Sequence, residues 1–221
     1  MLEARAYPLL QRPYSQGAMQ GLFVTFEGID RSGKTTQARM LCEALGGDAV
    51  GVREPGGTEV GERVRDILKD PRARLGPEGE ALLFAAARAE LVAQVIRPAL
   101  ESGLVVVSDR FLDSSLAYQG AARGLGVEEV ERINHFATGG LAPDLTFLLS
   151  IDPAAAEARA GESDRFEDEG RRLQEAVLAA YEELAAADPP RWRRVDADRA
   201  PEQVHADVMA EVEAARSAAR A

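Results

Sequence analysis

The sequence predicts an α/β fold in which a doubly wound, parallel five-stranded sheet is flanked by helices. Two observations carry this prediction. Short apolar runs alternate along the chain with longer segments of helical periodicity, and this alternation is typical of parallel sheets with crossover helices. The middle runs are nearly continuous in Val and Leu, as expected for strands buried on both faces.

Five apolar runs are expected to form the strands. They are LFVTFE (Leu22 to Glu27), AVGVRE (Ala49 to Glu54), LVVVSD (Leu104 to Asp109), LTFLLSID (Leu145 to Asp152) and RWRRVDA (Arg191 to Ala197). The last run is too basic to be assigned from periodicity alone. We assign it as a strand because it follows a long helical pattern and the turn signal DPP, and because another helical stretch comes after it.

The segments between these runs have helical patterns. The expected helices cover residues 35–45, 78–100, 128–138 and 167–187. The second has apolar residues on every turn, so we expect it to be largely buried. In the fourth, Leu173, Val177, Tyr181 and Leu184 form one stripe of a helix.

We expect one domain over residues 21–221, with a lid at about residues 154–172. That segment combines Gly161 with dense charge of both signs, a composition found in loops that close over phosphates, although a charged surface turn is the alternative. Residues 1–20 are expected to be a poorly ordered extension. Their apolar pieces are short and broken by Arg, Pro and Gln, unlike a signal peptide.

Composition excludes several classes of protein. The formal net charge is -11 and no basic stripe is visible, so we expect no nucleic-acid partner. Cys42 is the only cysteine, which rules out an intrachain disulfide and a cysteine-based metal site. No apolar stretch approaches the ~18 residues needed to span a bilayer. We therefore expect a cytoplasmic protein without a membrane partner.

The stretch GIDRSGKTTQ follows the first strand and matches the phosphate-loop pattern G-x-x-x-x-G-K-[ST]. Gly28 and Gly33 permit a backbone that points N–H groups at a phosphate, and the helix start adds its dipole. Lys34 can reach the β and γ oxygens of ATP, and Thr35 can place its hydroxyl on Mg²⁺. The predicted ATP-binding residues are Gly28, Ile29, Asp30, Arg31, Ser32, Gly33, Lys34, Thr35 and Thr36.

Two further strand ends carry polar residues. VREPGGT ends the second run with Glu54 and Pro55, and VSDRF ends the third with Asp109 and Arg110. Ligands of doubly wound sheets bind outside the carboxyl ends of the strands, so three strand ends deliver their residues to one crevice. For Asp109 and Arg110 alone, a strand-end ion pair is the alternative.

These motifs resemble those of bacterial thymidylate kinases, which phosphorylate dTMP to dTDP with MgATP on a P-loop NTPase-type fold. The resemblance runs from Leu22 almost to the C-terminus. It rests on FEGIDRSGKTTQ, REPGGT, LLFAAARAELV, SDRFLDSSLAYQG and DRFE in the expected lid. It implies ATP and dTMP as substrates, Mg²⁺ as cofactor and a homodimer formed by helix packing, for which the helix around residues 82–95 could serve.

The resemblance also implies how dTMP is bound. Phe84 would stack on thymine and Arg88 would donate to its O4 carbonyl; the two residues share one helix face because they are four apart. Arg110 would hold the dTMP phosphate, and Tyr118 would sit where a ribose 2′-hydroxyl projects, which selects deoxyribose. The predicted substrate-binding residues are Glu54, Pro55, Phe84, Arg88, Arg110, Ser115, Tyr118 and Gln119.

In that family, one group carries an arginine in the phosphate loop and another supplies arginines from the lid. This chain has Arg31 in the loop and also Arg159 and Arg165 in the lid region, so it fits neither group cleanly. We expect Arg31 to contact the transferring phosphoryl group and Arg165 to close onto ATP. The predicted catalytic residues are Asp30, Arg31, Lys34, Asp109, Arg110 and Arg165, and the predicted metal ligands are Thr35 and Asp109.

Three alternatives remain open from the sequence. The first is a kinase for another nucleoside monophosphate. The second is a deoxynucleoside kinase, in which Glu27 or Asp30 would act as base toward a 5′-hydroxyl. The third is a nucleotide-dependent switch or partition ATPase, although the chain lacks the N-K-x-D guanine motif. We expect the adenine of ATP to lie near residues 195–204.

Overall fold

The computed structural model describes residues 21–159 and 170–219. Its centre is a five-stranded sheet in the order β2-β3-β1-β4-β5, with every neighbouring pair parallel. The strands are β1 (Leu22–Glu27), β2 (Ala49–Arg53), β3 (Val105–Asp109), β4 (Leu145–Ser150) and β5 (Trp192–Asp196). The predicted fold class is confirmed. Each predicted strand is present, and β1 has the predicted bounds.

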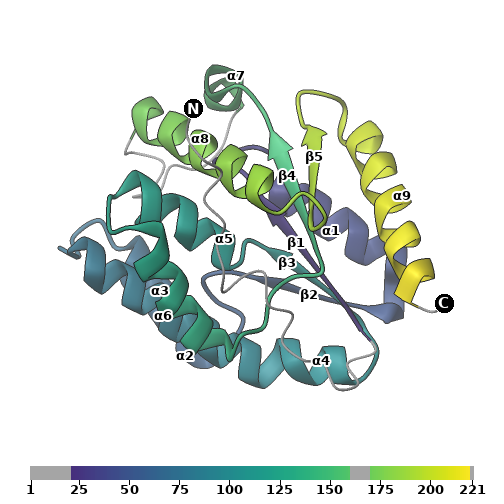
Figure 1. Cartoon of the computed structure of the whole chain (residues 1–221), viewed down its shortest axis with the longest axis horizontal. Coiled ribbons are helices and arrows are strands. Elements are labelled where there is room, and N and C mark those ends of the chain that lie inside the picture. Colours follow the sequence, from purple (N-terminus) through teal and green to yellow (C-terminus); the bar gives the residue numbers. More distant parts are fainter. Residues whose placement is uncertain (1–20, 160–169, 220–221) are drawn as a thin grey trace.

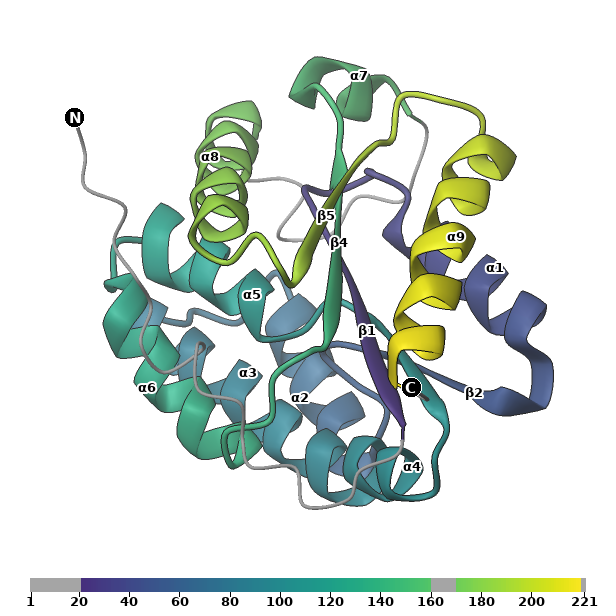
Figure 2. The ribbon, with the colours of Figure 1, turned by 45° about the vertical axis from the view of Figure 1, so that its right-hand side comes forward.

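Helices cover both faces of the sheet (Figure 1). They are α1 (Lys34–Leu45), α2 (Glu59–Lys69), α3 (Pro77–Leu91), α4 (Arg97–Glu101), α5 (Leu112–Ser115), α6 (Val127–Thr138), α7 (Pro153–Ala158), α8 (Arg171–Ala187) and α9 (Pro201–Ala219), with a 3₁₀ turn at Gly46–Asp48. Figure 2 shows α1 and α9 side by side on one face, and α3, α5, α6 and α8 on the other. No helix within the described ranges is long and apolar enough to cross a membrane.

The long helix expected over residues 78–100 is present, but it is interrupted. A π-helical segment at Val92–Ile96 separates α3 from α4. Pro98 explains the interruption, because its ring has no N–H to donate and clashes with the carbonyl four residues earlier. A second π-helical segment, Leu116–Ala122, continues α5. Neither it nor α2 was predicted, although Val60, Val64, Ile67 and Leu68 of α2 follow a regular helical period.

The expected lid is helical at its start. Helix α7 begins at Pro153, and the Asp152 side chain caps it by accepting from the N–H groups of Ala154 and Ala155, at 2.8 and 3.4 Å. Pro at the first helical position after an Asp cap is a typical helix start, which the prediction of a loop overlooked. Residues 160–169 of the lid, Arg165 among them, lie outside the described residues, as do residues 1–20.

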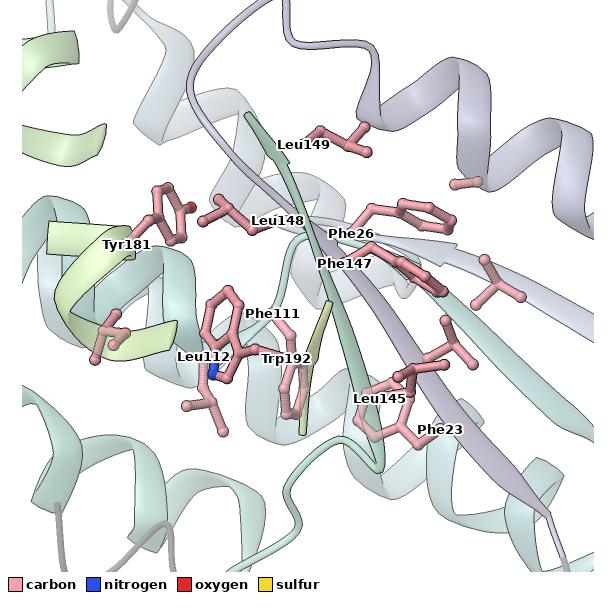
Figure 3. Close-up of a cluster of buried hydrophobic side chains, with 14 of the residues drawn as sticks. Phe23, Phe26, Phe111, Leu112, Leu145, Phe147, Leu148, Leu149, Tyr181 and Trp192 are labelled. Carbon is pink, nitrogen blue, oxygen red and sulfur yellow. The ribbon is translucent and has the colours of Figure 1, made fainter. Parts of the chain in front are cut away.

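The core lies along β1 and β4 and beneath α8 (Figure 3). Phe26 and Phe147 stack with ring centroids 5.3 Å apart, and Phe23 meets Phe111 edge to face at 4.8 Å. All six residues of β1 are buried, which fits a central strand covered on both faces. A rigid central strand fixes the place where the following loop, residues 28–33, leaves the sheet.

Candidate active site

A cavity of about 450 Å³ opens at the carboxyl ends of β1, β2 and β3. It lies beside the central strand, where the chain connections leave in opposite directions, as ligand sites of doubly wound sheets do. The predicted residues that line it are Asp30, Arg31, Lys34, Thr35, Glu54, Pro55, Phe84, Arg88, Asp109, Arg110, Ser115, Tyr118 and Gln119. Arg53, Arg65, Lys69 and Ser114 also line it and were not predicted.

The phosphate loop has the backbone that its motif requires. Gly28 and Gly33 have φ values of 142° and 100°, and Arg31 adopts 62°, a region that side chains other than Gly rarely occupy. A Cβ on Gly28 would lie 2.7 Å from the carbonyl oxygen of Leu149. The loop therefore depends on glycine where it passes β4, and it stores backbone strain at Arg31.

Lys34, the first residue of α1, is folded back over the phosphate loop. Its Nζ donates to the carbonyl of Ile29 at 2.6 Å and to Ser32 Oγ at 3.4 Å. Burial and the nearby Arg110 lower its pKa to about 8, although Asp30 and Asp109 oppose this shift. The nearby carboxylates therefore do not fully offset the unfavourable burial of the Lys34 ammonium, which makes it suited to bind an anion.

Thr35 and Asp109, the two predicted metal ligands, are in contact. Thr35 Oγ1 donates to Asp109 Oδ2 at 2.5 Å. Within the described ranges, no group of three or more His, Cys, Asp or Glu side chains could hold a metal ion. A cation at this pair would need further oxygen ligands, such as waters or phosphate oxygens of a nucleotide.

Arg110 follows β3 in the left-handed region, at a φ of 71°. Its guanidinium forms an ion pair with Asp30 and donates to Ser114 Oγ at 3.1 Å and to the carbonyl of Gly28 at 3.2 Å. The burial of Asp30 raises its pKa, but Arg110 and Lys34 outweigh burial and hold the pKa below its usual value. Asp30 therefore stays ionised between two cations.

Gln174 of α8 holds Asp30 from the other side. Its Nε2 donates to Asp30 Oδ2 at 2.8 Å, and its Oε1 accepts from the Asp30 N–H at 3.1 Å. Sequence reasoning missed this residue, although it follows Leu173 of the apolar stripe. The bidentate contact joins the helix that follows the lid to the phosphate loop.

The opposite end of the cavity is formed by a buried ion pair. Arg88 is 1% exposed, and its three nitrogens make five hydrogen bonds with protein acceptors. Two go to Glu54 Oε2, and the others go to Ser115 Oγ, Asn134 Oδ1 and the carbonyl of Phe111. Any contact of Arg88 with thymine O4 has to be shared with one of these acceptors, and the predicted contact stays a prediction.

Glu27 does not face the cavity. It is buried at the end of β1 and accepts hydrogen bonds from the N–H of Phe111 at 2.8 Å, from Ser114 Oγ at 2.6 Å and from the Tyr181 hydroxyl at 2.8 Å. Burial, followed by the charge of Asp113, raises its pKa to about 7. These contacts stabilise the cavity wall from its buried side. This position argues against Glu27 as the base of a deoxynucleoside kinase.

A second cavity, of about 460 Å³, lies on the far side of the phosphate loop. Arg31, Lys34 and Thr35 line both cavities. The remaining wall is formed by Ser32, Gly33, Thr36, Gln37, Arg159, Ala197, Arg199, Pro201 and Val204. Four of these residues belong to the segment 195–204 expected near adenine. Arg159 joins the loop to that segment, donating to the carbonyls of Arg31 at 3.1 Å and Ala197 at 2.6 Å.

Comparison with known proteins agrees with this geometry. The family model described as Thymidylate kinase matches residues 26–208. The chain is 50% identical to a thymidylate kinase of Pelotomaculum thermopropionicum over 199 residues, 86% of this chain and 92% of the relative. It is 47% identical to a thymidylate kinase of Deinococcus radiodurans over 199 residues, 87% of this chain and 97% of the relative.

A solved structure is also similar. The crystal structure of thymidylate kinase from Ehrlichia chaffeensis matches with a TM-score of 0.74 and 30% identity, covering 87% of this chain and 98% of that one. The likeness therefore extends over nearly the whole length of the relatives and includes the phosphate loop and most of both cavity walls. The chain belongs to the thymidylate kinase family.

Proposed function

We propose that the chain transfers the γ-phosphoryl group of ATP to the phosphate of dTMP, giving dTDP, with Mg²⁺ as the cofactor. The observation that carries the proposal is the pair of cavities that meet at the phosphate loop. ATP occupies the cavity beside α9, and dTMP occupies the cavity beside α3. Arg31, Lys34 and Thr35, which line both, then lie beside the phosphoryl group in transit.

The reaction requires cations rather than a base. The acceptor is a phosphate monoester with a second pKa of about 6, so it is mostly a dianion at neutral pH. The barrier arises from repulsion between two anions and from charge on the equatorial oxygens in the transition state. Lys34, Arg31 and Arg110 supply positive charge at that point, and positioning lowers the rest of the barrier.

Thr35 and Asp109 would hold the divalent cation, since a hydroxyl and a carboxylate are the hard oxygen donors that Mg²⁺ prefers. When bound, the cation neutralises charge on the phosphate oxygens. Asp30 has a different task, because its carboxylate is already shared between Arg110 and Gln174. It orients Arg110 toward the acceptor phosphate.

The test is an assay of ADP release with dTMP, dUMP, AMP and thymidine as acceptors. We expect dTMP to be preferred and thymidine to give no turnover. Preferential turnover of thymidine would overturn the proposal in favour of a deoxynucleoside kinase. ATP hydrolysis without any nucleotide acceptor, stimulated by DNA or a protein partner, would favour a switch ATPase. Arg165 as a residue that closes onto ATP stays a prediction.

We further propose a homodimer formed through α2, α3 and α6. These neighbouring helices carry the large apolar side chains that are most exposed within the described ranges. They are Phe136 at 89%, Leu82 at 56%, Val60 at 47% and Ile67 at 46%. Exposed apolar patches of this kind mark interfaces. The half-buried thiol of Cys42 fits a reducing compartment, and we propose that the enzyme works in the cytoplasm.

Sedimentation measures the oligomeric state directly. We expect the full chain to sediment as a dimer and Phe136→Glu to sediment as a monomer. Glu43→Lys, on the exposed side of α1, is the control that leaves the dimer intact. A monomeric wild-type chain would overturn the proposed dimer without affecting the proposed reaction.

A further inference from the structure

A buried acidic side chain lies behind the end of the cavity that is lined by Phe84 and Arg88, the base end. It has no part in the mechanism above. Glu80, in the first turn of α3, is 1% exposed. It precedes Phe84 and Arg88 by four and eight residues, so the three side chains follow one another along a single face of the helix. Phe84 and Arg88 line the cavity, whereas Glu80 lies outside its lining.

Glu80 reaches the cavity through Gln119. Gln119 Nε2 donates to Glu80 Oε1 at 2.9 Å, and both side chains are buried. The Arg123 Nε lies 2.6 Å from the same carboxylate oxygen and forms an ion pair with it, so this oxygen faces two nitrogen donors. A carboxylate paired with a guanidinium accepts hydrogen bonds. The amide of Gln119 must therefore turn its NH₂ toward Glu80, because the opposite orientation would bring two oxygens together.

The fixed amide has a consequence for the ligand. Glu80 takes up one hydrogen of this NH₂ and fixes the orientation of the amide, so the Gln119 Oε1 is directed away from Glu80. The wall at this point then offers a hydrogen-bond acceptor to a ligand. Thymine and uracil carry a hydrogen on N3 and can donate to it, whereas N3 of cytosine carries none and would face it lone pair to lone pair.

We propose that Glu80 is a positioning residue that sets the hydrogen-bonding polarity of Gln119 and so selects bases with an N3–H donor over cytosine. This inference rests on the proposed dTMP kinase activity. The device repeats what Glu54 does for Arg88 in the same cavity, where a buried carboxylate fixes the direction of a polar side chain. Arg88 and Gln119 thus each have an acidic partner behind them.

The experiment compares kcat and KM for dTMP and dCMP in three full-length variants. Glu80→Met removes the acceptor at similar volume. Glu80→Gln keeps an oxygen that can accept from Gln119 and from Arg123. Glu131→Met is the matched control, because it removes another buried glutamate, on the neighbouring helix α6, that does not line the cavity. Thermal melting of each variant reports on folding.

For Glu80→Met we expect the ratio of kcat/KM for dTMP to that for dCMP to fall by about tenfold, the effect of one hydrogen bond. The change should lie in KM, with kcat for dTMP within about threefold of wild type, since the amide contacts both ground and transition states. Glu80→Gln and Glu131→Met should keep the wild-type ratio.

A folded Glu80→Met variant that keeps the wild-type ratio would overturn the proposal, and so would an equal fall of the ratio in Glu131→Met. If Glu80→Met fails to fold, Glu80→Met/Arg123→Met is used instead, because it leaves no unpaired buried charge; the same ratio decides. Failure of the proposed function is recognised separately, since the wild-type chain would then not turn over dTMP.

Discussion

The two ends of the 450 Å³ cavity differ in how their charges are held. At the base end, Arg88 is 1% exposed and donates all five of its hydrogen bonds to protein acceptors. At the phosphate end, the Arg110 side chain is 19% exposed, and its contacts with the Tyr118 and Tyr181 hydroxyls are as long as 3.4 Å. The hydrogen bonds of Arg88 are therefore all made within the protein, whereas Arg110 can also bind a ligand.

The difference follows from what each end has to recognise. A base is neutral, and it is selected by shape and by the direction of donors and acceptors, which a rigid wall provides before the ligand arrives. A phosphate group is an anion, and it is held by cations whose charge the protein has not already neutralised. The burial of Lys34, which lowers its pKa to about 8, is the clearest sign that the phosphate end is complete only with its ligand.

The largest effect is expected from Lys34→Met, which removes a cation from the phosphate end. We expect kcat to fall by about 10⁴-fold, within the range found for cations that stabilise phosphoryl transfer. The melting temperature should not fall, because methionine removes an ammonium whose burial is unfavourable in the unliganded protein. Steady-state kinetics and thermal melting check the two parts. A variant that melts well below wild type would show that Lys34 supports the loop itself.

Arg88→Met breaks the base end instead. We expect a loss of about 3–5 kcal/mol in the free energy of unfolding, because Glu54 keeps a buried charge without a partner. The double variant Arg88→Met/Glu54→Leu should recover most of that loss and still bind dTMP weakly. Chemical denaturation measures the free energy of unfolding of the single and the double variant. Arg110→Met is the matched control. If Arg110→Met destabilises the fold as much as Arg88→Met, the two ends do not differ in the way described above.

Arg31→Ala tests which arginine serves the transferring group. Arg31 lines both cavities, and its Nη1 donates a hydrogen bond of 3.4 Å to the carbonyl of Glu157. We expect kcat to fall by about 10²-fold with little change in KM for dTMP. Arg159→Ala should act mainly on KM for ATP, since Arg159 lines only the second cavity. A kcat for Arg31→Ala within a few-fold of wild type would contradict the role assigned to Arg31.

Much of this arrangement could be predicted from local sequence. The strands are short apolar runs, and the residues that follow β1, β2 and β3 meet because parallel strands bring their carboxyl ends to one edge. Glu54 and Arg110 were placed in one site from such reasoning, although they lie far apart in the chain, whereas Arg88 was placed there by the resemblance to thymidylate kinases. The π-helical segment before Pro98 and the Asp152 cap of α7 also have local causes that a closer reading of the sequence would have found.

Other features depend on tertiary contacts that no local pattern encodes. Glu27 looks like any acid at a strand end, and only the fold shows that it faces inward to Ser114 and Tyr181. Glu80 and Gln174 occupy ordinary helix positions, and their partners lie on other elements.

The smallest effect is one of pH, and it separates the two ends without any mutation. With the pKa of Lys34 at about 8, the unliganded protein carries this charge in about 90% of molecules at pH 7 and about 10% at pH 9. Because a bound phosphate restores the charge, the affinity for ATP should fall by roughly tenfold over that range, or about 1.4 kcal/mol.

The stability of the unliganded chain should change in the opposite direction. The folded pKa of Lys34 is lower than its ordinary value of 10.5, so the unfolded chain binds more protons between these values. The free energy of unfolding therefore rises as pH increases from about 8 to 10.5. Titration calorimetry of ATP at pH 7 and pH 9 checks the first effect, and denaturation without nucleotide checks the second.

Lys34→Arg is the control for the pH effect, because a guanidinium stays charged across this range and its ATP affinity should be weak but independent of pH. Wild-type affinity that is equally flat would mean that Lys34 is already fully protonated at pH 9. The carbonyl of Ile29 and the carboxylates of Asp30 and Asp109 would then compensate its charge before the ligand arrives. In that case the phosphate end would be as complete as the base end, and catalytic charge would have to come from Arg31 and Arg110.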